Sequence, residues 1–382
     1  HTLWGGHLAN PDDWQQIDIG QYRDTFGPDG CATVLHLQLG VLPELRRQCP
    51  DALILVRVYL PNWRAVSPER HALDCAAIYR QVKPWTRHLC FANEQDLRAE
   101  SGGAIGAGDG HEITREDYEI IAWFNETFIR RFRTLPDCED AILHHPALAG
   151  GHQDVDGLKG YEVLRRAIDL CPVLDVHLYP SIDELVNDPW EGAARIDRVI
   201  DLFPGKPIFI SECGDFAVDD PRAPDHLVAC GYLWQSRPEV LGFTYFILAN
   251  PTGAPGNAPN DLSRNPAVLA ALKQATRVLR DDVPAVNLTS ESGAGDVMPT
   301  LDAPTGYQKA EGLIGPYVEA MRELYFGAGG PWQVSIARGE RGVMFHIAES
   351  NETLIYRPED GAIYRDYGNF SPDGALKKVH AR

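Results

Sequence analysis

The chain has 382 residues, which is long enough for one large domain and a second, smaller one. Its formal net charge of -19 at pH 7 leaves no basic face of the kind a nucleic-acid partner needs, so we expect no such partner. The sequence contains no run of about 18 apolar residues, so no segment is predicted to span a membrane.

Eight cysteines are scattered along the chain without C-x-x-C or any other zinc-ligand spacing. Several fall within apolar strands or on apolar faces of predicted helices, namely Cys75, Cys90, Cys171, Cys213 and Cys230. We expect buried free thiols rather than disulfides, which favours a reducing compartment such as the cytoplasm. The sequence begins at His1 rather than Met, so we interpret it as a processed or excised piece, and secretion stays open.

Apolar, strand-like runs alternate with helical patterns over the first 280 or so residues. The predicted strands are 3–7, 32–39, 53–59, 88–94, 141–145, 173–180, 208–212 and 241–248, with a polar loop after the first. The predicted helices are 42–47, 68–83, a long one starting at Thr114, 158–170, 190–203 and 266–279. Strands that are continuously apolar are typical of a parallel sheet covered on both faces.

The number and order of these elements predict an α/β fold, a (β/α)8 TIM barrel over residues 1–280. A doubly wound open sheet is the alternative, but the first strand is not followed by a G-x-G-x-x-G turn. The glycine-rich stretch 101–111 lacks the spacing and the lysine of a phosphate-binding loop, so we interpret it as a flexible loop at the rim of a cleft. We therefore predict no cofactor.

Residues 281–308 are rich in Pro, Ser, Gly and acidic residues, which predicts a linker. A small α+β module is predicted over 309–382, with an amphipathic helix at 313–325 and strands at 332–337, 343–348, 353–357 and 362–367. Aromatic residues of this module, such as Trp332 and Tyr356, either stack on a ligand or fill a small meander.

Two of the predicted strands end in a glutamate. The run Ile208-Phe209-Ile210 leads into Ser211-Glu212, and the fourth strand leads into Asn93-Glu94. A carboxylate at the end of a buried strand is costly unless the protein uses it. In a parallel barrel the active site lies at the carboxyl ends of the strands, so the two glutamates are expected to face each other across a cleft. Glycoside hydrolysis needs such a pair.

Other polar residues are predicted at the same face of the barrel. They are His7, His36 or Gln38, Arg57, Asn93, His144 or His145, His177 and Tyr179, with the aromatic Phe246 at the end of the eighth strand. A polar group at nearly every strand end indicates a cleft for a polar substrate, here an oligosaccharide or polysaccharide. The oligomeric state does not follow from the sequence.

Asn93-Glu94 on the fourth strand, His177-x-Tyr179 on the sixth and Ser211-Glu212 on the seventh resemble the clan A retaining glycoside hydrolases. The resemblance covers roughly residues 1–280. It implies that Glu94 is the acid/base, Glu212 the nucleophile and Tyr179 the residue that orients the nucleophile. It also implies that Asn93 holds a sugar hydroxyl. From their positions near the strand ends, the residues expected to line the substrate site are His177, Arg57, His7, His36 and Phe246.

The chain departs from this family at two positions. Gln95 stands where the family usually has Pro, and the eighth strand reads Phe243 to Leu248 without the usual Trp. The second departure leaves the substrate open. It also leaves open a barrel without catalytic activity, which binds a saccharide or serves as a structural part.

A metal-dependent hydrolase is a further alternative, because the chain has 13 histidines. Such sites use groupings such as H-x-H, whereas His144 and His145 are adjacent and are expected to point to opposite faces of a strand. We therefore predict no metal site. Two roles are open for Arg57: it donates to Glu212 within the site, or it is a structural ion-pair partner.

Overall fold

The computed structural model describes residues 2–8, 18–149, 159–181, 192–214, 218–248 and 261–281, and five strands between residues 334 and 380. The chain divides into two compact units, residues 1–277 and 278–382. The predicted linker 281–308, apart from residue 281, and the predicted helix at 313–325 lie outside the described residues. The predicted domain boundaries at 280 and 309 stay predictions.

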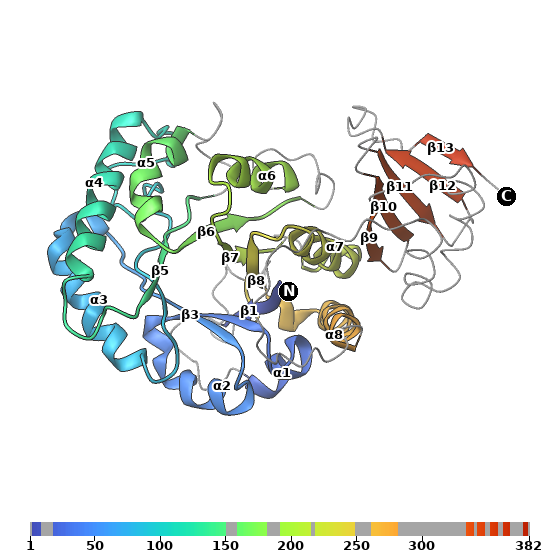
Figure 1. The fold of residues 1–382 in the computed structure, drawn as a ribbon, viewed down its shortest axis with the longest axis horizontal. Helices are drawn as coiled ribbons and strands as arrows, with labels where there is room; N and C mark the ends of the chain where they lie inside the picture. Colours follow the sequence, from blue (N-terminus) through green and yellow to red (C-terminus); the bar gives the residue numbers. More distant parts are fainter. Residues whose placement is uncertain are drawn as a thin grey trace, which may run out of the picture. The chain divides into compact units, whose positions relative to one another are not determined.

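The first unit is a closed barrel of eight parallel strands in sequential order, with β1 pairing with both β2 and β8. The strands are β1 (Leu3–His7), β2 (Cys31–Leu35), β3 (Leu53–Arg57), β4 (His88–Cys90), β5 (Ile142–His145), β6 (Val173–Leu178), β7 (Ile208–Cys213) and β8 (Val240–Tyr245). Figure 1 shows these strands at the centre of the unit and the helices outside them. The predicted (β/α)8 barrel is confirmed.

The helices follow the strands in the expected alternation. They are α1 (Ile19–Phe26), α2 (Leu42–Gln48), α3 (Pro68–Val82), α4 (Arg115–Phe132), α5 (Lys159–Leu170), α6 (Ala193–Leu202), α7 (Ala223–Gln235) and α8 (Pro266–Asp281). The predicted start of α4 is confirmed: Thr114 is its N-cap, and Thr114 and Asp117 form a reciprocal capping box. Among the described residues no helix is both long and apolar enough to cross a membrane.

The structure corrects the prediction of a polar loop after the first strand, because α1 lies there. Asp18 caps this helix by accepting a hydrogen bond from the Gln21 amide, and Ile19, Tyr22 and Phe26 form its buried face. Several predicted strands were also too long at their carboxyl ends. Residues such as Phe91, Ile247 and Leu248 are buried in loops, and an apolar pattern does not distinguish a buried loop from a strand.

The barrel interior below the carboxyl ends of the strands is filled by a cluster of small and large apolar residues. Its fully buried members are Cys31, Leu55, Cys90, Val173 and Phe209. Gly5 lets β1 approach this layer, because a Cβ atom at Gly5 would lie only 1.6 Å from the Cys31 carbonyl oxygen. The interior is therefore a packed core rather than a pore.

The second unit contains a five-stranded antiparallel sheet in the order β13-β12-β11-β10-β9. Its strands are β9 (Val334–Gly339), β10 (Gly342–Ile347), β11 (Glu352–Arg357), β12 (Ala362–Asp366) and β13 (Lys377–His380). The first four confirm the predicted strands to within two residues, and β13 was not predicted.

All eight cysteines lie in the first unit as buried free thiols, as predicted. Burial raises the pKa of several of them, for example to about 12 at Cys171. They act there as small apolar side chains.

Candidate active site

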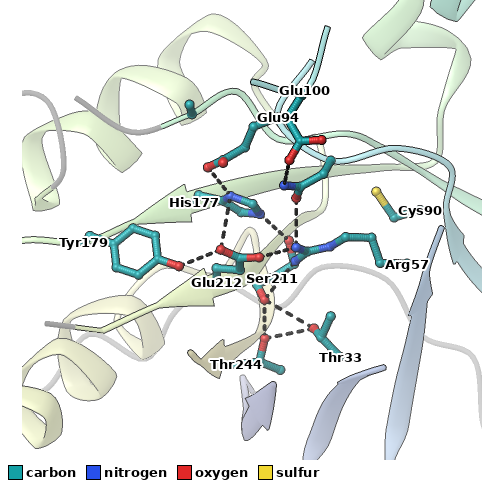
Figure 2. A network of polar contacts seen from close by, with 12 residues as sticks. Thr33, Arg57, Cys90, Glu94, Glu100, His177, Tyr179, Ser211, Glu212 and Thr244 are labelled. Carbon is teal, nitrogen blue, oxygen red and sulfur yellow. Dashed lines mark hydrogen bonds and ion pairs between the residues drawn. The ribbon is translucent and has the colours of Figure 1, made fainter. Parts of the chain in front are cut away.

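Several of the polar residues predicted at the carboxyl ends of the strands converge around Glu212, among them Arg57, His177 and Tyr179 (Figure 2). Arg57 ends β3, His177 lies near the end of β6 and Tyr179 directly follows that strand. Asn93 and Glu94 do not lie on β4 as predicted, because β4 ends at Cys90 and a short loop carries them. This loop still places both residues at the same end of the barrel.

A β-bulge in β7 turns Glu212 into the site. Ile210 pairs with Val176 of β6, but the next residue of β6, His177, pairs with Glu212, so Ser211 has no counterpart. A regular strand would point Ser211 and Glu212 to opposite faces. The extra residue lets both side chains point toward His177, and bulges are known to redirect side chains in this way beside active sites.

Hydroxyl groups hold the backbone of the bulge. The Ser211 carbonyl accepts hydrogen bonds from the hydroxyls of Thr244 at 2.5 Å and Thr33 at 3.3 Å, and from the Arg57 guanidinium at 3.3 Å. The Thr33 and Thr244 hydroxyls also lie 2.9 Å apart. All of these groups are buried, so the bulged peptide has a fixed position below the carboxylate.

Glu212 is a buried carboxylate with a donor on each oxygen. Arg57 forms an ion pair with Oε1, and the Tyr179 hydroxyl donates to Oε2 at 2.5 Å. Burial raises the pKa of Glu212, but His177, Arg57 and the Tyr179 hydroxyl together lower it more strongly, so the net pKa lies well below the ordinary value. Glu212 is therefore ionised across the physiological pH range.

His177 lies between Glu212 and Glu94 (Figure 2). Its Nδ1 is 2.7 Å from Glu94 Oε1 and 3.6 Å from Glu212 Oε2, and its Nε2 is 3.2 Å from the Ser211 hydroxyl. One carboxylate oxygen of each glutamate and one His177 nitrogen all lie within 4.8 Å of one another. The two carboxylates predicted from the sequence therefore form a close pair.

Asn93 connects Arg57 to a third carboxylate, Glu100. The Asn93 Oδ1 accepts a hydrogen bond from Arg57 at 2.9 Å, and its Nδ2 donates to Glu100 Oε1 at 3.1 Å. Burial raises the pKa of Glu100, and the nearby Glu94 and Glu212 raise it further, while the Asn93 hydrogen bond lowers it. These contacts form a continuous chain, Glu100–Asn93–Arg57–Glu212.

His7 and Phe246 form an adjacent aromatic wall. The His7 ring centroid lies 5.0 Å from that of Phe246, which in turn lies 6.3 Å from that of Tyr179. His7 is 2 % exposed, and among the described residues neither ring nitrogen has a hydrogen-bond partner. Burial, followed by the nearby Arg57, lowers the pKa of His7 to about 3, so this ring is neutral.

Glu94, His177 and Glu212 are also spaced so that they could hold a metal ion. The donor set fits a divalent cation in number, since it has two carboxylates and one imidazole. The Arg57 guanidinium already neutralises Glu212, and a cation at this position would meet its positive charge. The electrostatics therefore fit a metal poorly.

Four other candidate residues take no part in this network: His36, Gln38, His144 and His145. His36 Nδ1 accepts a hydrogen bond from the Tyr59 amide at 3.1 Å. The side chain of Gln38, in the 3₁₀ turn His36–Val41, accepts one from the Leu35 amide at 3.3 Å. His144 is fully buried, 2.6 Å from Asp175 and 2.9 Å from His88.

His145 points away from His144, as predicted for adjacent residues on a strand. It contacts Asn125 of α4 at 3.2 Å. The two histidines therefore do not form one metal site.

Three residues of this network were not predicted from the sequence: Glu100, Thr33 and Thr244. Glu100 lies in the stretch between β4 and α4, where no repeat pattern indicates which side chain turns back toward the strand end. The glycine-rich part of this stretch, predicted to be flexible, is held by its own hydrogen bonds. The Ala107 amide donates to the Asp96 carbonyl and the Ser101 hydroxyl donates to the Ile105 carbonyl.

No protein-family model matches the chain, and no curated protein matches it. Among solved structures, fungal β-1,4-galactanases align with a TM-score of 0.53 at 10% identity, covering 72% of this chain and 99% of theirs. A broad-specificity endoglucanase from Clostridium longisporum aligns with a TM-score of 0.48 at 12% identity, covering 68% and 84%. An endo-β-1,3-glucanase from Pseudomonas viridiflava aligns with a TM-score of 0.44 at 15% identity, covering 72% of this chain and 96% of that one.

The likeness to the galactanases shows that the two barrels share a fold. At such low identity it identifies neither a substrate nor a catalytic residue of this chain. An argument for function must come from the site itself.

Proposed function

We propose that the chain is a retaining glycoside hydrolase that acts by double displacement on an oligosaccharide or polysaccharide. The observation that carries the proposal is the close approach of the Glu94 and Glu212 carboxylates, with one oxygen of each within 4.8 Å of the other. Retaining enzymes place their two carboxyl groups about 5–5.5 Å apart, whereas inverting enzymes leave about 6.5–9.5 Å for a water molecule. The fold, shared with the galactanases, agrees with this chemistry but does not establish it.

Glu212 has the properties of the nucleophile. It is ionised because of Arg57 and Tyr179, and the bulge at Ser211 aims it into the cleft. Its carboxylate attacks the anomeric carbon, the bond from that carbon to the leaving oxygen breaks, and a glycosyl ester forms on Glu212.

Glu94 has the properties of the acid/base. His177 occupies its Oε1 at 2.7 Å, and among the described residues Oε2 has no hydrogen-bond partner. In the first step Glu94 gives its proton to the leaving oxygen. In the second step it takes a proton from the water that attacks the glycosyl ester, and the sugar leaves with its configuration retained.

The test compares Glu94→Ala with Glu212→Ala on aryl glycosides, with the exposed Glu112→Gln as a matched carboxylate control. We expect Glu212→Ala to lose turnover by several orders of magnitude on every substrate. Glu94→Ala should still form the glycosyl-enzyme from substrates with good leaving groups but hydrolyse it slowly, because it lacks the base.

Azide needs no deprotonation, so it should restore turnover of Glu94→Ala and give a glycosyl azide of retained configuration. With Glu212→Ala it should give the inverted product, because azide then attacks the face that the carboxylate occupied. The opposite pattern would show that the two roles are exchanged. Normal activity in both variants would place the catalytic site elsewhere, and saccharide binding without any turnover would favour the non-catalytic barrel.

A further inference from the structure

The amide of Asn93 lies between two groups of opposite hydrogen-bonding character. Arg57 offers only donors and binds Oδ1 at 2.9 Å, whereas the Glu100 carboxylate is an acceptor and binds Nδ2 at 3.1 Å. An asparagine side chain can usually turn over and exchange its oxygen and nitrogen at little cost. Here both neighbours select the same orientation, so the amide nitrogen is directed away from Arg57.

One N–H of this amide stays available to a ligand. The nitrogen carries two hydrogens, Glu100 takes one, and among the described residues the second has no partner. Asn93 is only half-buried and directly precedes Glu94 in the chain. A donor of fixed direction therefore stands beside the proposed acid/base.

The loop after β4 holds Glu100 at this position. The Glu100 carbonyl accepts a hydrogen bond from the Trp63 amide at 3.1 Å, and the Trp63 indole donates to the Gln95 carbonyl at 3.1 Å. Trp63 is 1 % exposed and its ring packs against Phe124 of α4. Glu100 therefore has a fixed backbone, unlike a carboxylate on an exposed loop.

We propose that Glu100 is a positioning residue, which acts through Asn93 to present one N–H donor to a single hydroxyl of the bound sugar. Glu100 thereby makes that hydroxyl a determinant of substrate specificity. Arg57 binds the oxygen of the amide and also binds Glu212. The same chain of contacts therefore fixes the position of the Asn93 N–H relative to the proposed nucleophile, Glu212. This inference rests on the proposed glycosidase function.

The kinetic test uses the best aryl glycoside of the wild-type chain and its monodeoxy analogues. Glu100→Ala should lower kcat/KM for the full substrate about tenfold, the usual effect of losing one hydrogen bond beside a charged group. For the analogue that lacks the hydroxyl held by Asn93, the loss should be less than about twofold. Glu100→Gln, whose amide oxygen still accepts, should restore part of the activity.

A double-mutant cycle separates positioning from a general structural role. In an Asn93→Ala background, Glu100→Ala should change kcat/KM by less than about twofold, because Glu100 then has nothing left to orient. If the effects of the two substitutions instead multiply, or if every deoxy analogue suffers the same loss, Glu100 only supports the loop and the proposal is wrong. Glu112→Gln, an exposed carboxylate change before α4, is the matched control and should have no effect.

A second measurement needs no activity. The side-chain NH2 signals of Asn93 in a ¹⁵N-edited NMR spectrum can be identified by their loss in Asn93→Ala. The proton bound to Glu100 should lie downfield in the wild-type chain and move upfield in Glu100→Ala. An unchanged pair of signals would overturn the positioning role even in an active glycosidase, whereas a shifted pair in a chain that hydrolyses no glycoside would reject only the proposed function.

Discussion

Two buried histidines, His7 and His145, and the half-buried His88 predict that the barrel loses stability in mild acid. Burial lowers the pKa of His7 and of His88 to about 3, and that of His145 to about 4. Around His145 the neutral ring fits its neighbours, since one ring nitrogen is 2.9 Å from the Pro146 carbonyl and the other accepts from Asn125. In the unfolded chain each of these histidines takes up a proton near pH 6.5.

The direction and the size of the change in stability with pH follow from this difference in protonation. Below about pH 6.5 the unfolded chain binds protons that the folded barrel does not. The free energy of unfolding therefore decreases as the pH falls from about 6.5 toward the pKa values of these histidines in the folded barrel. Between pH 7.5 and 5.5 each histidine removes about 1.4 kcal/mol from the free energy of unfolding, or about 4 kcal/mol for all three. This is a large part of the roughly 5–15 kcal/mol that stabilises a typical domain. Glu100, whose pKa is raised, acts in the opposite direction.

The assay is urea unfolding of the full chain at pH 7.5, 6.5 and 5.5, followed by circular dichroism at 222 nm, since every described helix lies within residues 19–281. His145→Gln removes one of the three titrations, so its loss between pH 7.5 and 5.5 should be smaller by about a third. The exposed His111→Gln should leave the pH dependence unchanged. Equal stability of the wild-type chain at pH 7.5 and 5.5 would refute the reasoning.

Three further predictions follow from single features of the barrel. Tyr179→Phe removes the hydroxyl on Glu212 Oε2, so kcat/KM on aryl glycosides should fall about tenfold to a hundredfold, while an unchanged value would deny Tyr179 its orienting role. Gly5→Ala places a Cβ 1.6 Å from the Cys31 carbonyl, so circular dichroism should show no cooperative melting, and a wild-type melting curve would contradict the packing. Truncation at about residue 305 should leave a soluble barrel with the same small-substrate activity, and its aggregation would show that a later segment completes the core.

The barrel could be predicted because its strands are buried on both faces and therefore read as continuous apolar runs between helical patterns. The capped helix α1 carried a readable signal as well, since Asp18 precedes Ile19, Tyr22 and Phe26 at helical spacing. The segment was nevertheless interpreted as a loop, because polar residues such as Gln21, Arg23 and Asp24 lie between the few apolar residues of α1. Strand ends were less predictable, since buried loop residues such as Phe91 continue the apolar pattern.

Within the site, residues that close an apolar run could be predicted, whether they lie on the strand or in the loop directly after it. Residues that lie farther along a loop, or that act on the backbone, could not. Glu94 and Glu212 were recognisable as carboxylates that close apolar runs. Glu100 reaches Asn93 only because the loop after β4 folds back, and that path depends on contacts such as the one from Trp63. Thr33 and Thr244 donate to the Ser211 carbonyl, and no sequence pattern in either strand indicates a contact with the backbone of another strand.

The direction of the Glu212 carboxylate, the proposed nucleophile, depends on the one extra residue that forms the bulge in β7. If the same residues of β7 paired regularly with β6, Ser211 would lie opposite His177 and the Glu212 carboxylate would turn toward the surrounding helices. A designer who transfers this site to another barrel must therefore copy the insertion together with the glutamate. The hydroxyls of Thr33 and Thr244, which bind the displaced carbonyl, belong to the same transferable unit.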